Sequence, residues 1–156
     1  MVRLKDAARC IFILVLSAGV IFLTNALAQP EDENSLKAIM PMAERFEPVK
    51  SKEGIIYYKA YDKTGEFFGA AFKTSEKVYS HRIETLAGML RDGTITSIKI
   101  LSQDGGALGP DFTGQFKDKK DLSNIQAVSG ATMSSKAVID SVQNKAKEIM
   151  ALLNQK

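Results

Sequence analysis

The spacing of apolar residues changes at Thr132, and this change constrains the fold more than any other feature of the sequence. Before Thr132, apolar and β-branched residues gather in short runs that are typical of strands. After Thr132, apolar residues recur at helical spacing on one stripe, formed by Val138, Val142, Ala146, Ile149 and Leu153. The sequence therefore predicts an α+β fold that ends in an amphipathic helix.

Four strand-like runs precede this helix and pair into two hairpins. The first hairpin covers residues 55–61 and 66–72, and the second covers residues 84–90 and 94–101. Each pair is separated by a short polar turn that ends in glycine, a signal for antiparallel pairing. We expect an antiparallel β-sheet of about four or more strands, in an order that the pattern leaves open. Residues 103–110 are glycine-rich and predict a loop, and residues 112–116 fit a single helical turn.

The first 28 residues have the pattern of an export signal. Three basic residues precede an apolar run over residues 10–23, and the small residues Ala26 and Ala28 follow it. Positive charge before the run keeps the N-terminus in the cytoplasm, so the rest of the chain is expected on the extracytoplasmic side of the cell (inner) membrane. The small residues favour cleavage, whereas an apolar stretch to Ala28 approaches the ~17 residues of a minimal span. A cleaved signal peptide and a retained anchor helix both remain open.

The predicted organisation has three parts. Residues 1–28 are a signal peptide or signal anchor, residues 29–50 a connecting helix and linker, and residues 51–156 the folded domain. The connecting helix is predicted because Leu36, Ile39 and Met40 have helical spacing, which Pro41 ends. The chain is 45% apolar and 25% charged, as expected for a chain that folds into one small domain.

Charge and rare residue types exclude several functional classes. Removing the first 28 residues takes away three bases and one acid and lowers the formal net charge from +3 to +1. The remaining lysines are interspersed with acids, so nucleic acid is not an expected partner. One cysteine, Cys10, and one histidine, His81, provide neither a multi-cysteine metal site nor a plausible hydrolytic triad. We expect no catalytic residues and no bound metal.

Residues 129–132, with the sequence Ser-Gly-Ala-Thr, place small side chains directly before the predicted helix. A helix N-terminus offers unpaired N–H groups and a partial positive charge, and small residues allow a phosphate to approach. Ser134 or Ser135 is the predicted N-cap. Taken alone, this pattern is more often an ordinary turn before a helix. The dipole contributes only about 0.3 to 1 kcal/mol at an exposed end, too little to hold a nucleotide.

A longer stretch, residues 127–138, reads Ala-Val-Ser-Gly-Ala-Thr-Met-Ser-Ser-Lys-Ala-Val and resembles the flavinylation segment of FMN-binding domains. Such domains are found in the G subunit of Rnf complexes and the C subunit of sodium-translocating NADH:quinone reductases. The resemblance covers most of residues 32–153, and its matching stretches occur in the same order: 36–42, 57–69, 79–83, the strand after Gly93, 108–109 and 112–117.

The resemblance implies that FMN is joined to Thr132 by a phosphodiester bond. A separate flavin transferase installs the group in that family, with FAD as the donor and a divalent cation. A hydroxyl with no neighbouring base is a poor nucleophile, which agrees with a need for a second enzyme. The residues that the resemblance places at the cofactor are Thr132, Ser129, Gly130, Ala131, Met133, Ser134, Ser135, Leu108 and Tyr79.

Two single positions and one short stretch depart from the family pattern. Gln126 stands six residues before Thr132, where the family usually has aspartate, and Val78 replaces a usual glycine. Residues 104–109 read Asp-Gly-Gly-Ala-Leu-Gly, where the family often has Glu-Thr-Pro-Gly-Leu-Gly. These departures affect the expected transferase recognition and the expected contacts to the flavin ring.

The function implied by the resemblance is that of an extracytoplasmic flavoprotein in membrane-associated electron transfer. The cofactor supplies the redox chemistry, and the protein supplies position and electrostatics. The chain is expected to act as a subunit of an Rnf-like or Nqr-like complex or as a free-standing carrier, with membrane electron-transport subunits as possible redox partners. The alternative, favoured by Gln126, is an FMN-binding or structural domain without covalent flavin.

Overall fold

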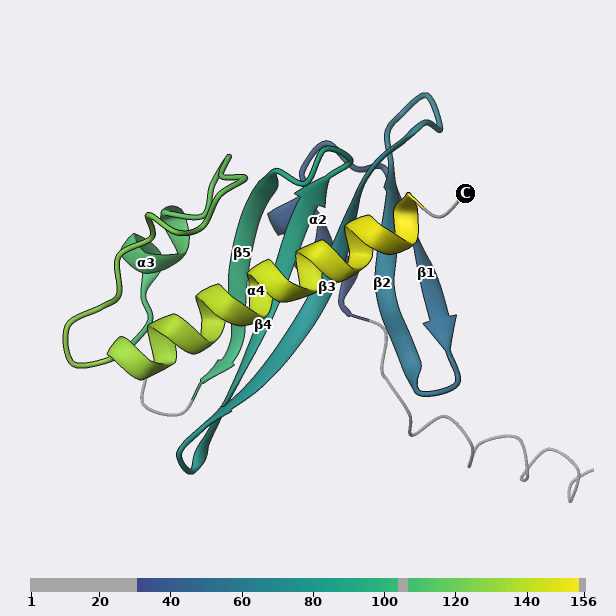
Figure 1. The fold of residues 1–156 in the computed structure, drawn as a ribbon. Helices are drawn as coiled ribbons and strands as arrows, with labels where there is room; N and C mark the ends of the chain where they lie inside the picture. The colour runs from purple at the N-terminus through teal and green to yellow at the C-terminus, as the bar shows by residue number, and fades with distance from the viewer. Residues whose placement is uncertain (1–30, 104–106, 155–156) are drawn as a thin grey trace, which may run out of the picture.

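The computed structural model describes residues 31–103 and 107–154, so the predicted signal or anchor helix lies outside the described residues. Figure 1 shows a sheet with one long helix across its front face and a short helix behind it. The elements in chain order are α2 (Glu33–Ile39), β1 (Arg45–Ser51), β2 (Gly54–Tyr61), β3 (Phe67–Val78), β4 (His81–Leu90), β5 (Ile95–Gln103), α3 (Pro110–Gly114) and α4 (Thr132–Leu153).

The five strands form one antiparallel sheet in the order β1-β2-β3-β4-β5, so each strand pairs with its neighbours in sequence. This arrangement and the C-terminal helix confirm the predicted α+β class. The central pair, β3 and β4, is in register from Gly69↔Leu90 to Val78↔His81. Short hairpin connections explain this order, because each strand returns directly alongside the one before it.

The larger core lies between α4 and one face of the sheet. Successive side chains of a strand point to opposite faces, so alternate residues of β4 face α4. Among the buried residues of this cluster are Phe72 of β3, Ala87 and Met89 of β4, and Val138 and Val142 of α4. Burial of these side chains is worth about 1.5 to 3 kcal/mol for each large residue, which makes this face the main source of stability.

A smaller core lies on the opposite face, beneath α2. Leu36, Ile39 and Met40 pack there against Leu86 and other small or apolar residues of the sheet. Gly88 allows this close approach, because a Cβ at that position would lie 2.6 Å from the Met40 side chain. The hydroxyl of Thr96 donates to the carbonyl of Ile39 at 2.8 Å and closes the C-terminal end of α2.

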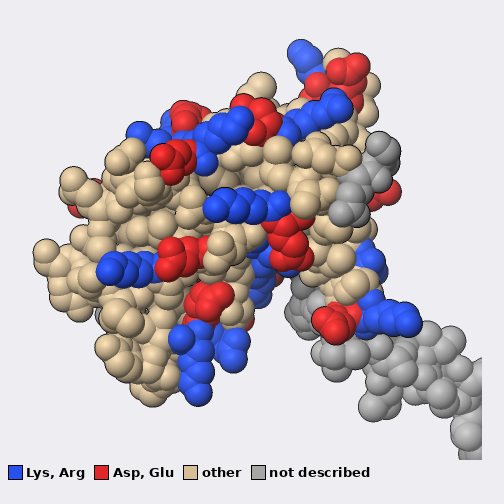
Figure 2. Space-filling view, viewed as in Figure 1, with Lys and Arg blue, Asp and Glu red and all other residues tan. Residues whose placement is uncertain are grey.

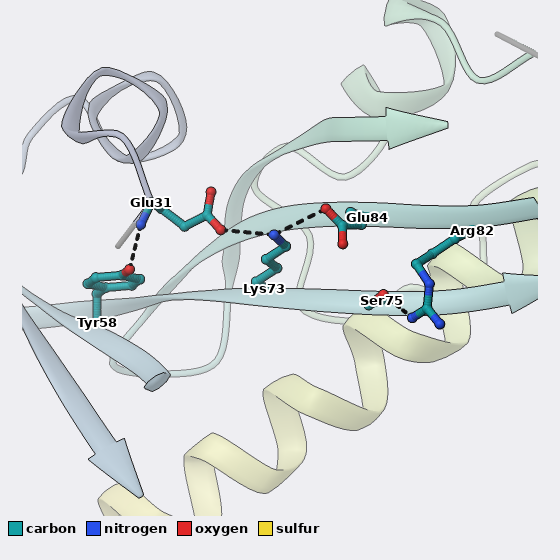
Figure 3. A network of polar contacts seen from close by, with 6 residues as sticks. All are labelled: Glu31, Tyr58, Lys73, Ser75, Arg82 and Glu84. Atoms are coloured by element: carbon teal, nitrogen blue, oxygen red, sulfur yellow. Dashed lines mark hydrogen bonds and ion pairs between the residues drawn. The ribbon is translucent and has the colours of Figure 1, made fainter. Parts of the chain in front are cut away.

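A network of polar contacts fixes Glu31 to the sheet on this second face (Figure 3). The Lys73 ammonium lies 3.1 Å from a carboxylate oxygen of Glu31 and 3.1 Å from one of Glu84. The backbone N–H of Glu31 donates to the Tyr58 hydroxyl at 2.7 Å. Partial burial disfavours the charged lysine, but both carboxylates outweigh it and raise the pKa of Lys73. The chain therefore enters the domain at a defined position.

The two largest differences between the observed strands and the sequence prediction are at β1 and β3. β1 occupies Arg45–Ser51, where the sequence predicts a linker, because an edge strand is mostly exposed and tolerates Pro48. β3 continues to Val78, beyond the predicted end at residue 72. Buried and exposed side chains continue to alternate there: Thr74 and Val78 are buried, and Lys73, Ser75 and Lys77 are exposed. No helix within residues 31–103 and 107–154 is long and apolar enough to span a bilayer.

Candidate functional site

Thr132 begins α4 near the end of the sheet where β3 turns into β4 and where β5 ends. These three strand ends lie together because the strands are antiparallel neighbours. Figure 1 shows the start of α4 toward this end, at the lower left. Val78, Leu108 and Ala131 are buried in the same core cluster. The fold thus brings three predicted site segments, distant in sequence, to one end of the molecule.

The segment before Thr132 is a tight turn over residues 128–131. The N–H of Ala131 donates to the carbonyl of Val128 at 3.0 Å. Gly130, the third residue of this turn, has φ +79°. A Cβ at Gly130 would meet no atom within 4 Å, so its backbone conformation, and not lack of space, requires glycine here. The small-residue motif is therefore a turn that delivers the chain into α4.

Ser135 fastens this turn to the helix. Its Oγ accepts from the N–H of Val128 at 3.0 Å and donates to the carbonyl of Ala131 at 2.9 Å, and its side chain is fully buried. The prediction that Ser134 or Ser135 is the N-cap is wrong, because the N-cap of α4 is Ala131, three residues before Ser134 and four before Ser135. Ser135 bonds back toward the chain that precedes the helix, a structural role that spacing alone does not reveal.

Thr132 is the first residue of α4, and its side chain is exposed. Within the described part of the chain its hydroxyl makes no hydrogen bond, and Ala131 provides no side-chain cap. The N–H groups of Thr132, Met133 and Ser134 have no intrahelical acceptor, because the first three N–H groups of a helix precede the hydrogen-bonded ladder. The first turn contains no acidic residue. An anion at this position meets free donors and no opposing carboxylate.

Lys136 lies one helical turn after Thr132, on the same face of α4, and its side chain is exposed. Its ammonium can therefore reach a negative group carried by Thr132. Lysines and arginines elsewhere on the face that α4 covers are interspersed with acids (Figure 2). The start of α4 is thus a local cationic position on a surface of mixed charge.

Tyr79 occupies the turn between β3 and β4 with φ +55°, a left-handed conformation that is rare for residues other than glycine. Its side chain is 78% exposed, the highest value among the large apolar and aromatic residues of the described chain. The strained backbone costs about 1 to 3 kcal/mol and holds the ring outward at the end of the sheet. Met133 is also exposed, so the surface at this end includes apolar side chains.

Leu108 differs from Tyr79 because its side chain is buried in the main core. The Gln103 side chain holds the backbone of Leu108 with two hydrogen bonds: its amide nitrogen donates to the Leu108 carbonyl at 3.1 Å, and its amide oxygen accepts from the Leu108 N–H at 3.2 Å. The sequence does not predict this contact, because a glutamine that binds the backbone of another segment leaves no hydrophobic pattern in the sequence. Leu108 is therefore fixed in the core, and the neighbouring Gly109 is partly exposed.

Gln115 makes an equivalent pair of bonds to the chain that leads to Thr132. Its amide oxygen accepts from the Gln126 N–H at 2.8 Å, and its amide nitrogen donates to the Gln126 carbonyl at 3.2 Å. The Gln126 side chain is exposed. Gln126, which departs from the family's aspartate, is therefore held by its backbone and presents its side chain to the outside.

Carboxylates of the described chain with shifted pKa values take part in turns. No group of three or more His, Cys, Asp or Glu residues that could hold a metal is present among the residues that the structure describes. Asp62, Asp92 and Asp121 have lowered pKa values because each carboxylate accepts hydrogen bonds within its own turn. These carboxylates organise turns, and the turns at Asp62 and Asp92 lie at the end of the sheet opposite the turn between β3 and β4. The start of α4 instead offers free N–H donors to an anionic group.

Known proteins resemble this chain in sequence and in fold. The sequence profile of the FMN-binding domain family matches residues 79–147, which include Tyr79, Leu108 and Thr132. The G subunit of an ion-translocating oxidoreductase complex from Methanosarcina acetivorans is 31% identical over 147 residues, covering 80% of this chain and 78% of that protein. The G subunit of a proton-translocating ferredoxin:NAD(+) oxidoreductase complex from Clostridium ljungdahlii is 26% identical over 161 residues, covering 90% and 85%.

The fold also has a known counterpart. The crystal structure of Shewanella oneidensis NqrC superposes with a TM-score of 0.51 and covers 78% of each chain, at 15% sequence identity. This likeness shows a shared fold. The extent and level of identity to the Methanosarcina protein, together with the profile match, establish the relationship in sequence. The chain therefore belongs to the FMN-binding domain family that includes the G subunits of ion-translocating oxidoreductase complexes.

Proposed function

We propose that this chain carries FMN, joined through its phosphate to the hydroxyl of Thr132, and serves in membrane-associated electron transfer. The observation that carries the proposal is the position of Thr132: an exposed hydroxyl at the first residue of α4, inside the family match. Bound FMN supplies redox chemistry by accepting one or two electrons. The chain's own residues hold the group and set its surroundings.

The residues around Thr132 fit a phosphodiester. The free N–H groups at the start of α4 face the position next to the Thr132 side chain, and a phosphodiester keeps one negative charge for them to stabilise. Lys136 adds a cation on the same face. Each such contribution is modest at an exposed helix end, about 0.3 to 1 kcal/mol, so a covalent bond is what makes attachment permanent.

The covalent step needs a second enzyme and balances with FAD as the donor. The Thr132 Oγ1 forms a bond to the phosphorus of the FMN half of FAD. The pyrophosphate P–O bond of FAD breaks, AMP leaves, and the hydroxyl proton passes to a base of the transferase or to water. Thr132 has no such base among its hydrogen-bond partners in the described chain, so the flavin transferase must supply the activation.

The exposed residues at this end of the molecule are proposed to surround the flavin ring. Tyr79 and Met133 are exposed, and the loop at Leu108 is held against the core nearby. Aromatic and thioether side chains pack well against planar rings. Ser129 and Gly130 leave room beside the attachment point, whereas Ala131, Ser134 and Ser135 support the turn and the first turn of α4.

The wider setting follows from the N-terminal segment and the relatives. We propose that residues 1–28 act as a signal peptide or signal anchor, and that residues 29–50 connect them to the domain. Basic residues before the apolar run favour an extracytoplasmic domain at the membrane. Two relatives are named as subunits of ion-translocating complexes, which supports redox partners among membrane electron-transport subunits. A free-standing carrier remains the second form of the same proposal.

The test is production of the protein together with a flavin transferase, followed by denaturing electrophoresis under ultraviolet light. Native protein is expected to give a fluorescent band, which Thr132→Val abolishes, because valine keeps the shape but removes the hydroxyl. Thr113→Val is the matched control, since the Thr113 hydroxyl donates only to the carbonyl of Pro110 within the short helix α3. Its band should remain.

Absence of a fluorescent band from the native protein, under conditions that label a known family member, would overturn covalent attachment. The alternative, an FMN-binding or structural domain without covalent flavin, would then be favoured. Equilibrium binding of free FMN to the same preparation distinguishes the two forms of that alternative. A band that persists in Thr132→Val would place the attachment at another residue.

A further inference from the structure

The chain that leads to Thr132 has little regular structure of its own. Residues 115–131 follow α3 and reach α4 through turns and one isolated bridge, between Ile95 and Lys119. Leu122 is buried in the main core and anchors the middle of this segment. Residues beyond Leu122 depend on contacts from other parts of the chain to keep a defined path.

Ile125 and Val128 pack against the main core. Two side chains add hydrogen bonds to the last part of the segment. Gln115 bonds both the N–H and the carbonyl of Gln126, and Ser135 accepts from the N–H of Val128. The side chains of Gln126, Ala127 and Ser129 are exposed. The result is a surface strip, residues 126–132, in which Gln126, Ala127, Ser129 and Thr132 have exposed side chains, whereas Val128 and Ala131 pack against the main core. We refer to residues 126–132 as the acceptor strip.

Ser135 and Gln115 differ in their position relative to α4. Ser135 lies within α4, so its loss also disturbs the start of the helix. Gln115 lies outside α4, directly after α3, and its side chain hydrogen-bonds the backbone of Gln126, 11 residues away. A change at Gln115 can therefore loosen the strip while the helix that carries Thr132 remains in place.

We propose that Gln115 is a positioning residue for modification of Thr132: its amide group holds the acceptor strip in the shape that the flavin transferase binds. This inference rests on the proposed function. A strip that is already ordered loses less conformational entropy when an enzyme binds it. Gln115 therefore acts on the affinity of the transferase for this protein, and Thr132 remains the reacting group.

The expected consequence is a separation of kinetic constants. In Gln115→Ala, the KM of the transferase for this protein should rise about tenfold, the equivalent of losing two hydrogen bonds of ordinary strength, while kcat changes less than twofold. Gln115→Glu keeps the oxygen that accepts from the Gln126 N–H and loses the donor, so its KM should lie between those of native protein and Gln115→Ala. Gln115→Asn is too short to make both bonds and should resemble Gln115→Ala.

Hydrogen exchange gives a readout that does not depend on the transferase. The Gln126 amide should exchange faster in Gln115→Ala than in native protein and should stay largely protected in Gln115→Glu. Gln143→Ala is the matched control, because Gln143 lies on α4 and its side-chain amide makes no hydrogen bond within the described chain. Neither the KM of the transferase for Gln143→Ala nor the exchange rate of the Gln126 amide should differ from the native values.

The outcomes separate this inference from the function it rests on. Failure of native protein to accept FMN overturns both. Normal labelling of native protein with an unchanged KM for Gln115→Ala, or with a loss confined to kcat, overturns only the role of Gln115. If Gln115→Ala does not fold, the ordered series of KM values for native protein, Gln115→Glu and Gln115→Asn provides the test. Equal KM values in that series contradict the proposal.

Discussion

At the scale of single residues, the site depends on a few positions whose roles are conformational. Gly130 supplies a positive φ, Ser135 joins the turn to α4, and Tyr79 accepts a left-handed backbone at an exposed turn. Gly130 and Ser135 set the path of the chain into Thr132, and Tyr79 sets the shape of the turn between β3 and β4. Their substitutions should therefore first affect stability and geometry.

Gly130→Ala should lower the free energy of unfolding by about 1 to 2 kcal/mol, the cost of a left-handed conformation for a residue with a Cβ. Space is not limiting, because the added Cβ meets no atom within 4 Å. Gly114→Ala is the matched control: Gly114 has equally free space and no positive φ. Urea unfolding measures the free energy of unfolding of both variants. Equal stability of the two variants would contradict the conformational role of Gly130.

Ser135→Ala should lower the free energy of unfolding by about 1 to 3 kcal/mol, because the partly buried Val128 N–H loses its acceptor. The neighbouring Ser134→Ala removes a more exposed hydroxyl that makes no hydrogen bond within the described chain, and it should change stability by less than about 0.5 kcal/mol. Thermal and urea unfolding of the pair measure the difference. A larger loss in Ser134→Ala would show that the bonds of Ser135 are not what fastens the turn.

Residue patterns alone predict part of this site. The glycine and the small residues before the helix mark a turn, and the family resemblance identifies Thr132. The same patterns misplace the start of α4, because a serine near a helix start usually caps it, whereas the Ser135 side chain bonds backward to Val128 and Ala131. The amide contacts of Gln103 and Gln115 could not be foreseen, since they depend on how distant segments fold together.

At the scale of elements, turns and paired strands set the shape of the domain. The turn between β2 and β3 is organised by Asp62, whose carboxylate accepts from the Thr64 hydroxyl at 2.6 Å, the Thr64 N–H at 2.8 Å and the Glu66 N–H at 3.0 Å. Such turns have clear sequence signals, and both predicted hairpins are present. β1 lacks a signal of this kind, because its side chains are mostly exposed at the sheet edge.

The Asp62 turn predicts a pH dependence of stability. Hydrogen bonds from Thr64, and then from Glu66, lower the pKa of Asp62 below its ordinary value of 3.8. A carboxyl group with a lowered folded-state pKa contributes stability above its ordinary value, and this contribution is lost as the pH falls through the lowered pKa. The difference in unfolding free energy between native protein and Asp62→Ala should therefore be larger at pH 7 than near pH 2.

Asp140→Ala serves as the control for that comparison, because it removes an exposed carboxylate of α4 that makes no hydrogen bond within the described chain. Urea unfolding at both pH values measures the two differences. A difference for Asp62→Ala that stays constant or grows on acidification contradicts the role assigned to the turn.

At the scale of the whole molecule, α4 connects the two ends of the sheet. A Cβ on Gly93, in the turn between β4 and β5, would lie 3.7 Å from the Met150 side chain, so the C-terminal half of α4 passes beside that turn. Thr132, at the other end of this 22-residue helix, lies toward the turn between β3 and β4. The proposed attachment point is thus held by a long, well-packed element, which suits a carrier that must present its cofactor in a fixed position.

This long-range arrangement is only partly accessible from sequence. Hydrophobic spacing predicts the helix and the strands, because burial of one face imposes a period on each element. It does not place Tyr79, Leu108 and Thr132 at the same end, since that depends on strand order and on the path of α4 across the sheet. The resemblance to a known family names those residues, and the strand order and the path of α4 bring their segments to one end of the molecule.

The central claim, attachment of FMN to Thr132, is tested most directly by mass spectrometry of the protein produced with a flavin transferase. The intact mass should increase by that of FMN less one water, and fragmentation of the peptide covering residues 121–136 should place the increase on Thr132 and on none of the serines in that peptide. An unchanged intact mass, or an increase located on another residue, would contradict the account.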